Sequence, residues 1–147
     1  MTLKNSLRLI VRIFLGGLFA LSGWLALTQP IEYFQLAVNQ YQLLPDPFVE
    51  PASYAIAWTE LIVGTFLLLG YSFPTSARII AGLILIFEIV LALAIFRNLP
   101  VRECGCLGGL VTFTPAQTYI IDSVLLWLAF WVGRNKAIPL AVDNFYQ

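Results

Sequence analysis

Four long apolar runs constrain this 147-residue chain more than any other feature of its sequence. They cover roughly 7–27, 52–70, 77–97 and 116–133, and each is close to the ~20 residues that an α-helix needs to cross a bilayer. Hydrophobic residues make up 60% of the chain and charged residues 11%, which is far more apolar than an ordinary soluble domain. The sequence therefore predicts an all-α integral membrane protein, a four-transmembrane-helix antiparallel bundle that forms a single domain over 1–147.

The connection between the first two runs has a helical pattern of its own. Pro30 suits the first turn of a helix, and apolar residues recur at spacings of three and four from Ile31 to Tyr41. This pattern predicts an amphipathic helix over about 30–44, either interfacial in the membrane or packed over the bundle. The second and third runs are joined only by 71–76, so they should be antiparallel neighbours, with Ser76 capping the third spanning helix. Pro115 is expected to open the fourth.

Lysine and arginine are distributed unevenly between the connections, and this asymmetry predicts orientation. The basic residues near one side are Lys4, Arg8, Arg12, Arg78, Arg134 and Lys136. The connection 28–51, by contrast, holds three acids and no basic residue. We therefore expect a multi-pass protein of the bacterial plasma (inner) membrane with both termini cytoplasmic and the 98–115 connection extracytoplasmic.

The N-terminal run resembles a secretory signal because basic residues precede it. We expect a retained helix, since bulky Trp24 and Leu27 occupy its end, and cleavage after the Ala20–Ser22 region is the alternative. Arg12 near the cytoplasmic end of this helix is expected to snorkel to the lipid headgroups.

Histidine is absent from the chain, and this absence narrows its chemistry. The usual haem ligand, the commonest zinc ligand and the usual general base are missing, so Ser-His and Cys-His catalysis are excluded. The net charge is zero and the basic residues are dispersed, which argues against nucleic acid as a partner. The lipid bilayer is the partner that the composition predicts.

The two cysteines of the chain are Cys104 and Cys106, separated by Gly105. Cα atoms two residues apart are roughly 5.5 to 7 Å from one another, and a disulfide needs about 4.4 to 6.8 Å, so a bent Cys-Gly-Cys segment can close. Such a small, strained and exposed ring would be labile rather than structural. Arg102 would favour the thiolate form, whereas Glu103 would oppose it.

Three interpretations of this pair compete. The leading one is a dithiol/disulfide exchange centre. A metal site would need Glu103 or Asp122 as further ligands, so no metal is expected. The third is a pair of ordinary loop cysteines that are inert or staple a turn.

Three acids interrupt the apolar runs: Glu60, Glu88 and Asp122. An ionisable residue in a membrane span is a functional-site candidate. From the rise of 1.5 Å per residue, Glu60 and Glu88 lie roughly 14 Å and Asp122 about 9 Å below the outer surface, beneath the cysteines. We interpret them as a proton relay to the thiols or as a structural polar cluster. The candidate structural partners are Thr59, Thr65, Gln117, Ser123, Arg97 and Arg102.

Three stretches resemble one known family. They are 41–45 (Tyr-Gln-Leu-Leu-Pro), 58–64 (Trp-Thr-Glu-Leu-Ile-Val-Gly) and 104–108 (Cys-Gly-Cys-Leu-Gly). They are similar to the methylamine-utilisation MauE family, within the DoxX-like group of four-helix membrane proteins, although that family usually has phenylalanine at the position of Leu107. The resemblance implies a redox-associated membrane protein that helps to form or maintain disulfides in exported proteins, often beside a thioredoxin-like partner.

The residues and the resemblance together predict a membrane thiol-disulfide redox protein. Cys104 and Cys106 would exchange electrons with an extracytoplasmic thioredoxin-like protein or a disulfide-containing client. Quinone is a candidate electron acceptor, with Tyr41, Trp58 and Phe113 as candidate pocket residues, although an interfacial aromatic belt is the commoner explanation of such residues. The alternative function is a non-enzymatic assembly factor or docking subunit. The direction of electron flow, the attacking cysteine and the oligomeric state stay open.

Overall fold

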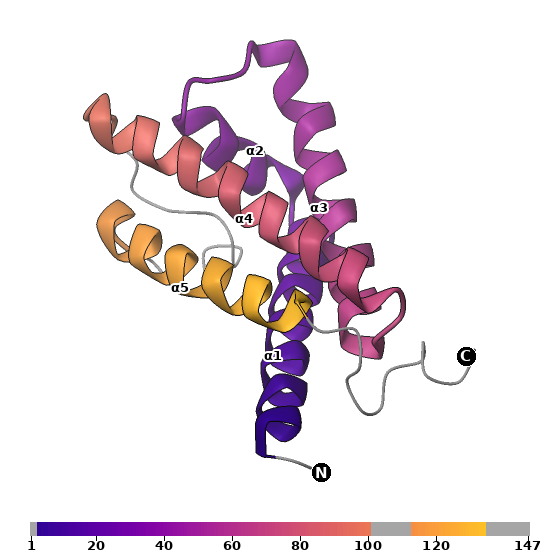
Figure 1. Ribbon diagram of the computed structural model, residues 1–147. Coiled ribbons are helices and arrows are strands. Elements are labelled where there is room, and N and C mark those ends of the chain that lie inside the picture. The colour runs from indigo at the N-terminus through magenta and orange to yellow at the C-terminus, as the bar shows by residue number, and fades with distance from the viewer. Residues whose placement is uncertain (1–2, 101–112, 135–147) are drawn as a thin grey trace.

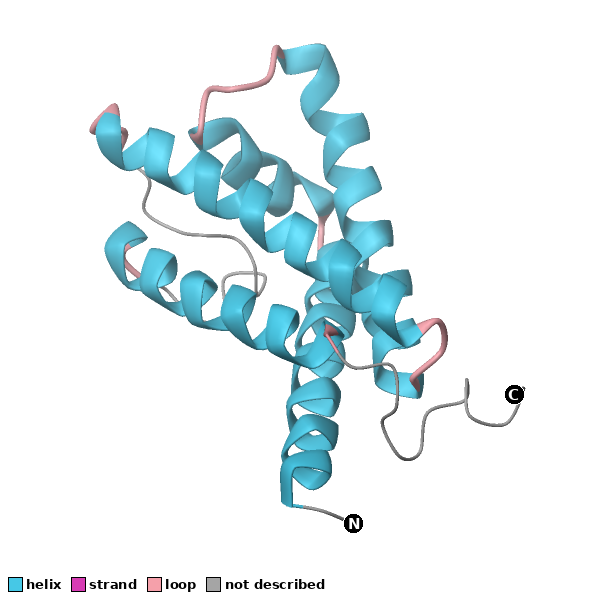
Figure 2. Ribbon diagram, in the orientation of Figure 1, coloured by secondary structure: helices cyan, strands magenta, loops and turns pink. Residues whose placement is uncertain are grey.

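The computed structural model describes residues 3–100 and 113–134, and all of its regular structure there is helical (Figures 1 and 2). The helices are α1 (Leu3–Thr28), α2 (Ile31–Gln40), α3 (Asp46–Leu69), α4 (Phe73–Phe96) and α5 (Pro115–Gly133). The helices α1, α3, α4 and α5 are long and apolar enough to cross a membrane. The predicted all-α class with four spans is therefore confirmed.

Prolines decide where two of the spanning helices begin. Helix α3 starts at Asp46, several residues before the predicted start, because Pro47 lies in the first turn, where a helix does not need the N–H that proline lacks. Pro51 is then accommodated inside α3. Helix α4 likewise starts early, at Phe73, with proline in its first turn.

The predicted cap at Ser76 is wrong. Ser76 lies inside α4, and its hydroxyl donates to the backbone oxygen of Tyr71 at 3.2 Å, while Ser72 occupies the N-cap position. Helix α2 also ends earlier than predicted, at Gln40, because Gln42 adopts a φ of 49°, which a helix cannot contain. The prediction that Pro115 opens the fourth spanning helix is confirmed, because α5 begins at Pro115.

The spanning helices associate as two pairs, α1 with α3 and α4 with α5. In Figure 1 the α4–α5 pair runs obliquely across the α1–α3 pair. Glycines allow α1 and α3 to approach closely: a Cβ atom placed on Gly23 would lie 2.5 Å from the backbone nitrogen of Leu61, and one on Gly16 would lie 2.7 Å from that of Leu68. Packing of small residues therefore joins this pair, as is common in lipid.

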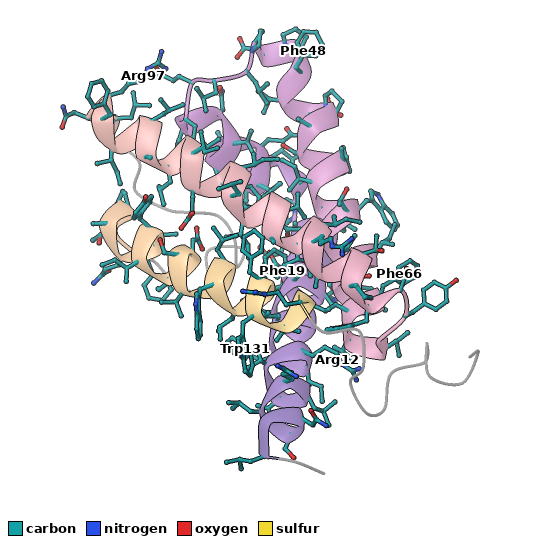
Figure 3. The ribbon with its side chains drawn as sticks, in the orientation of Figure 1. Arg12, Phe19, Phe48, Phe66, Arg97 and Trp131 are labelled. Atoms are coloured by element: carbon teal, nitrogen blue, oxygen red, sulfur yellow. The ribbon has the colours of Figure 1, made fainter. Side chains whose placement is uncertain are left out.

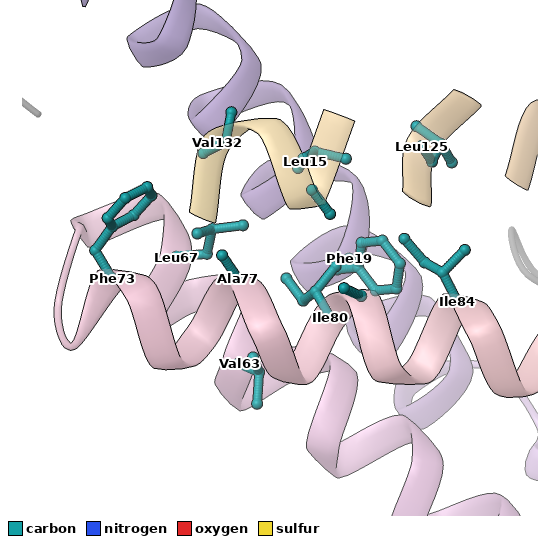
Figure 4. Close-up of a cluster of buried hydrophobic side chains, with 12 residues drawn as sticks. Leu15, Phe19, Val63, Leu67, Phe73, Ala77, Ile80, Ile84, Leu125 and Val132 are labelled. Carbon is teal, nitrogen blue, oxygen red and sulfur yellow. The ribbon is translucent and has the colours of Figure 1, made fainter. Parts of the chain in front are cut away.

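The hydrophobic core is built by all four spanning helices (Figure 4). Its fully buried members include Leu15 from α1, Leu67 from α3, Ile80 from α4 and Val132 from α5. These residues lie toward the end of the bundle where α3 ends and α4 begins. The buried acids Glu60 and Glu88 lie outside this core cluster.

Arg12 departs from the prediction made for it. The sequence predicted that its side chain would snorkel to the lipid headgroups. In the structure the side chain is only 3% exposed and is buried within the protein. Arg8, one turn earlier on α1, lies over the ring of Trp131, 5.3 Å from the ring centroid. Basic side chains of α1 therefore contribute to helix packing at this end.

Candidate functional site

One end of the bundle brings together α2, the last turn of α1, the first turn of α3, the last turn of α4 and the first turn of α5. We call it the α2 end. Figure 3 shows Phe48 of α3 and Arg97 after α4 at this end, away from Arg12 and Phe66. The connection between α4 and α5 begins and finishes here. Its central residues, including the predicted site residues Cys104, Cys106, Arg102 and Glu103, lie outside the described residues.

Glu60 lies inside α3 and is only 3% exposed. The buried hydroxyl of Ser22 on α1 donates a hydrogen bond to its Oε2 atom at 2.9 Å. This bond connects two different helices inside the protein, where a polar group has few other hydrogen-bond partners. The side chain of Glu60 is therefore held in one position relative to α1.

Glu88 on α4 has a matching arrangement with α5. It is buried, and the hydroxyl of Ser123 lies 2.6 Å from its Oε1 atom. The same hydroxyl lies 2.9 Å from the backbone oxygen of Tyr119. Each helix pair thus places one serine hydroxyl against one buried acid of the neighbouring helix.

Asp122 connects the two acids spatially. It precedes Ser123 on α5, is half-buried, and lies close enough to Glu88 for their carboxyl groups to interact electrostatically. Asp122 and Glu60 also line the same cavity. The structure therefore brings the three acids into one region near the α2 end, and their role as a proton relay stays a prediction.

The hydroxyl partners could be anticipated only in part. Ser123 was among the candidates, but Thr59 and Thr65 donate to backbone oxygens one turn earlier in their own helix. Gln117 instead forms a capping box with Thr114 at the start of α5. Ser22 was not among the candidates, because which residues of α1 face α3 depends on how the two helices pack.

A cavity of about 250 Å³ lies between α2 and the bundle. Residues of α2 and of the segment after it form one wall, and residues of α3, α4 and α5 form the rest. Tyr41, one of the three aromatic residues named as candidates for a quinone pocket, lines this cavity. Trp58 and Phe113 do not belong to its lining and are 52% and 37% exposed.

No three His, Cys, Asp or Glu residues within 3–100 and 113–134 form a group that could hold a metal ion. The acids nevertheless share one region. Their arrangement suits hydrogen bonding and proton transfer between carboxyl and hydroxyl groups.

These features define a membrane protein with four candidate spanning helices, a shared apolar core and buried acids. Residues 4–134 match the family profile of Methylamine utilisation protein MauE, so the chain belongs to the MauE family. It is 29% identical over 131 residues to Methylamine utilization protein MauE of Methylorubrum extorquens strain AM1. That alignment covers 89% of this chain and 63% of the relative, so the chain spans less than two thirds of the relative's length. No solved structure matches the chain.

Proposed function

We propose that this protein is a membrane thiol-disulfide redox protein that acts through Cys104 and Cys106. The observation that carries the proposal is the gathering of Glu60, Glu88 and Asp122 near the end of the bundle that the cysteine-bearing connection joins. Thiol exchange moves protons as well as electrons, and buried carboxyl groups beside hydroxyl donors are suited to proton transfer.

The exchange step balances without a metal. A thiolate of the partner attacks one sulfur of the Cys104–Cys106 disulfide, the sulfur–sulfur bond breaks, and a mixed disulfide forms. The second thiolate of the partner attacks this mixed disulfide, so the partner becomes oxidised and the cysteine pair becomes a dithiol. Two electrons pass to the pair, and two protons accompany them.

Reoxidation of the pair needs an acceptor of two electrons and two protons. A membrane quinone meets this requirement: the dithiol becomes a disulfide and the quinone becomes a quinol. The same pair operating in reverse would deliver electrons outward. Known four-helix quinone-coupled thiol oxidases use a second cysteine pair, which this chain lacks, so Cys104 and Cys106 would react with the quinone directly.

The charge distribution supports an extracytoplasmic position for the cysteine pair. Arg8, Arg12, Arg78 and Arg134 lie toward the end of the bundle opposite α2, whereas the three acids of the connection 28–51 lie at the α2 end. By the positive-inside rule the α2 end faces away from the cytoplasm, in a compartment where disulfides persist. We therefore propose that the protein lies in the inner membrane with cytoplasmic termini.

The partner that we propose is an extracytoplasmic thioredoxin-like protein or a disulfide-containing client. The relative from Methylorubrum extorquens is named for methylamine utilisation. For this chain we propose only the general thiol chemistry, and we leave the client to experiment.

A trapping experiment tests the proposal. Membranes from cells expressing Cys104→Ser or Cys106→Ser are treated with acid to quench exchange, and mixed disulfides are separated on non-reducing gels. A redox relay gives a covalent adduct with one single variant and none with the double variant. Absence of any adduct from both single variants, with the wild-type pair always reduced, would refute the relay.

The second candidate function is a non-enzymatic assembly factor or docking subunit. It is favoured by the outward side of α2, where Tyr33 and Leu36 are exposed. A docking subunit would keep its partner and its cellular phenotype when both cysteines are serine, whereas a relay would lose the phenotype.

A further inference from the structure

The cavity beneath α2 has a lining that specifies the chemistry of a ligand. Ten of its thirteen lining side chains are aliphatic or aromatic hydrocarbon, and the other three are Tyr41, Glu60 and Asp122. The polar groups come from three separate parts of the chain: the segment after α2, helix α3 and helix α5. Tertiary packing therefore brings a few polar groups into an otherwise apolar space, as in small-molecule sites.

These walls disfavour charged ligands. An anion or a cation would lose its hydration among the hydrocarbon walls. A neutral carbonyl group fits better, because a protonated carboxyl group and a phenol each carry an O–H that can donate to it. The Ser22 hydroxyl, by donating to Glu60 Oε2, holds that carboxyl group in place.

The cavity also borders the surface that faces lipid. Ile86 on α4 lines it and is nevertheless 58% exposed. A volume of about 250 Å³ lies just below the roughly 300–1,000 Å³ of typical ligand pockets, so the cavity holds a compact head rather than a long hydrocarbon tail. A tail would leave past Ile86 and continue in the bilayer.

We propose that this cavity binds the carbonyl-bearing head of a membrane-soluble lipid, with Tyr41, Glu60 and Asp122 as its hydrogen-bonding groups. Two sources share this chemistry: the ring carbonyls of a quinone and the ester carbonyl of a glycerolipid. Binding does not require the cysteine pair. If the occupant is a quinone, this inference rests on the proposed function, because the bound quinone would be the electron acceptor that the redox cycle needs.

Equilibrium binding to the full-length protein tests this site. The protein is placed in nanodiscs of ether-linked phospholipid, which has no ester carbonyl, and receives either a radiolabelled benzoquinone with a decyl tail or a radiolabelled short-chain diacylglycerol. Saturable binding of either probe is expected. Preference for the quinone or for the ester identifies the source.

Paired variants locate the binding. Val90→Trp fills the cavity, and its control Ile89→Trp adds the same ring to an exposed position on the same helix. We expect Val90→Trp to weaken binding at least about tenfold, the loss that corresponds to 1.4 kcal/mol, while Ile89→Trp changes it less than about threefold. Asp122→Leu should weaken binding similarly, and Asp122→Asn, which keeps a hydrogen-bond donor, should retain it.

Circular dichroism of the helical signal and size-exclusion chromatography test whether each variant is folded. If Val90→Trp is misfolded, Ala37→Leu is used as the cavity-filling variant instead. Absence of saturable binding for both probes, or equal binding by the cavity-filling variant and wild type, would overturn the site. The variant with both cysteines changed to serine should bind normally. If the wild-type cysteine pair shows no thiol exchange while the protein still binds a probe, only the redox proposal is refuted.

Discussion

The Ser22 hydroxyl on α1 donates a 2.9 Å hydrogen bond to Glu60 on α3, across the helix pair that packs most extensively in the bundle. The same α1–α3 interface contains glycines that permit close backbone approach. One polar bond and close packing thus act on the same interface. Together they set the position of an acid that lines the cavity below α2.

Replacing Ser22 with alanine should destabilise the protein. The Ser22→Ala change removes a donor from buried Glu60, and interhelical hydrogen bonds in membranes contribute about 1 kcal/mol. We expect the free energy of unfolding in detergent to fall by about that amount. Thr59→Ala is the control, because that hydroxyl bonds within its own helix, and it should change stability by less than about 0.5 kcal/mol. Equal effects would contradict a role for the interhelical bond.

Adding a methyl group at the α1–α3 contact should separate the helices. In Gly16→Ala or Gly23→Ala the new Cβ would meet backbone atoms of α3, which cannot move aside as a side chain does. We expect a loss of about 1–3 kcal/mol for each, as for other overpacked sites. Thermal unfolding in detergent measures it.

Gly17→Ala is the matched control for this prediction. It lies next to Gly16 on α1, but its new Cβ would have a side-chain atom of Leu68 at 3.8 Å as its nearest neighbour. Because alanine favours helix over glycine, this variant should be neutral or more stable by about 0.5–1 kcal/mol. If Gly17→Ala is as harmful as Gly16→Ala, close helix approach does not explain the glycines.

The start of α5 depends on a capping box. Thr114 accepts a hydrogen bond from the backbone of Gln117, whose side chain in turn accepts from the backbone N–H of Thr114. Thr114→Ala should cost about 1 kcal/mol, and the double variant with Gln117→Ala should cost less than the sum of the singles, because the two bonds form one motif. Strict additivity in a double-mutant cycle would show that the two bonds are independent.

If the buried acids relay protons, their amides should slow thiol chemistry. We expect Glu88→Gln or Asp122→Asn to reduce the rate of oxidation of the cysteine pair about a hundredfold, the lower range for general acid–base catalysis. The control is Glu50→Gln, an exposed acid at the same end of the bundle, which should leave the rate unchanged. Alkylation of free thiols after rapid quenching measures the rate. Unaltered oxidation in folded, inserted amide variants would remove the relay and leave a structural polar cluster.

Helix number and type followed from local pattern. Long apolar runs leave few alternatives in a membrane, since each backbone polar group must be satisfied within its own helix. The helix starts at Asp46 and Phe73 were harder to predict, because a proline in a first turn and a proline that ends a helix look alike in sequence. The burial of Arg12 could not be predicted from the sequence either. It depends on which residues pack around the side chain, and a position near a helix end does not reveal those residues.

The position of Glu60, Glu88 and Asp122 along their own helices could be predicted from the sequence, because helical rise converts residue number into height along a helix. Their partners and shared cavity were not, since these depend on helix rotation and on which helices pair. Helix pairing placed Ser22 against one acid and Ser123 against another, and the packing of α2 over α3 brought Tyr41 to the cavity wall. Height is a property of one helix, whereas a cavity is a property of several packed together.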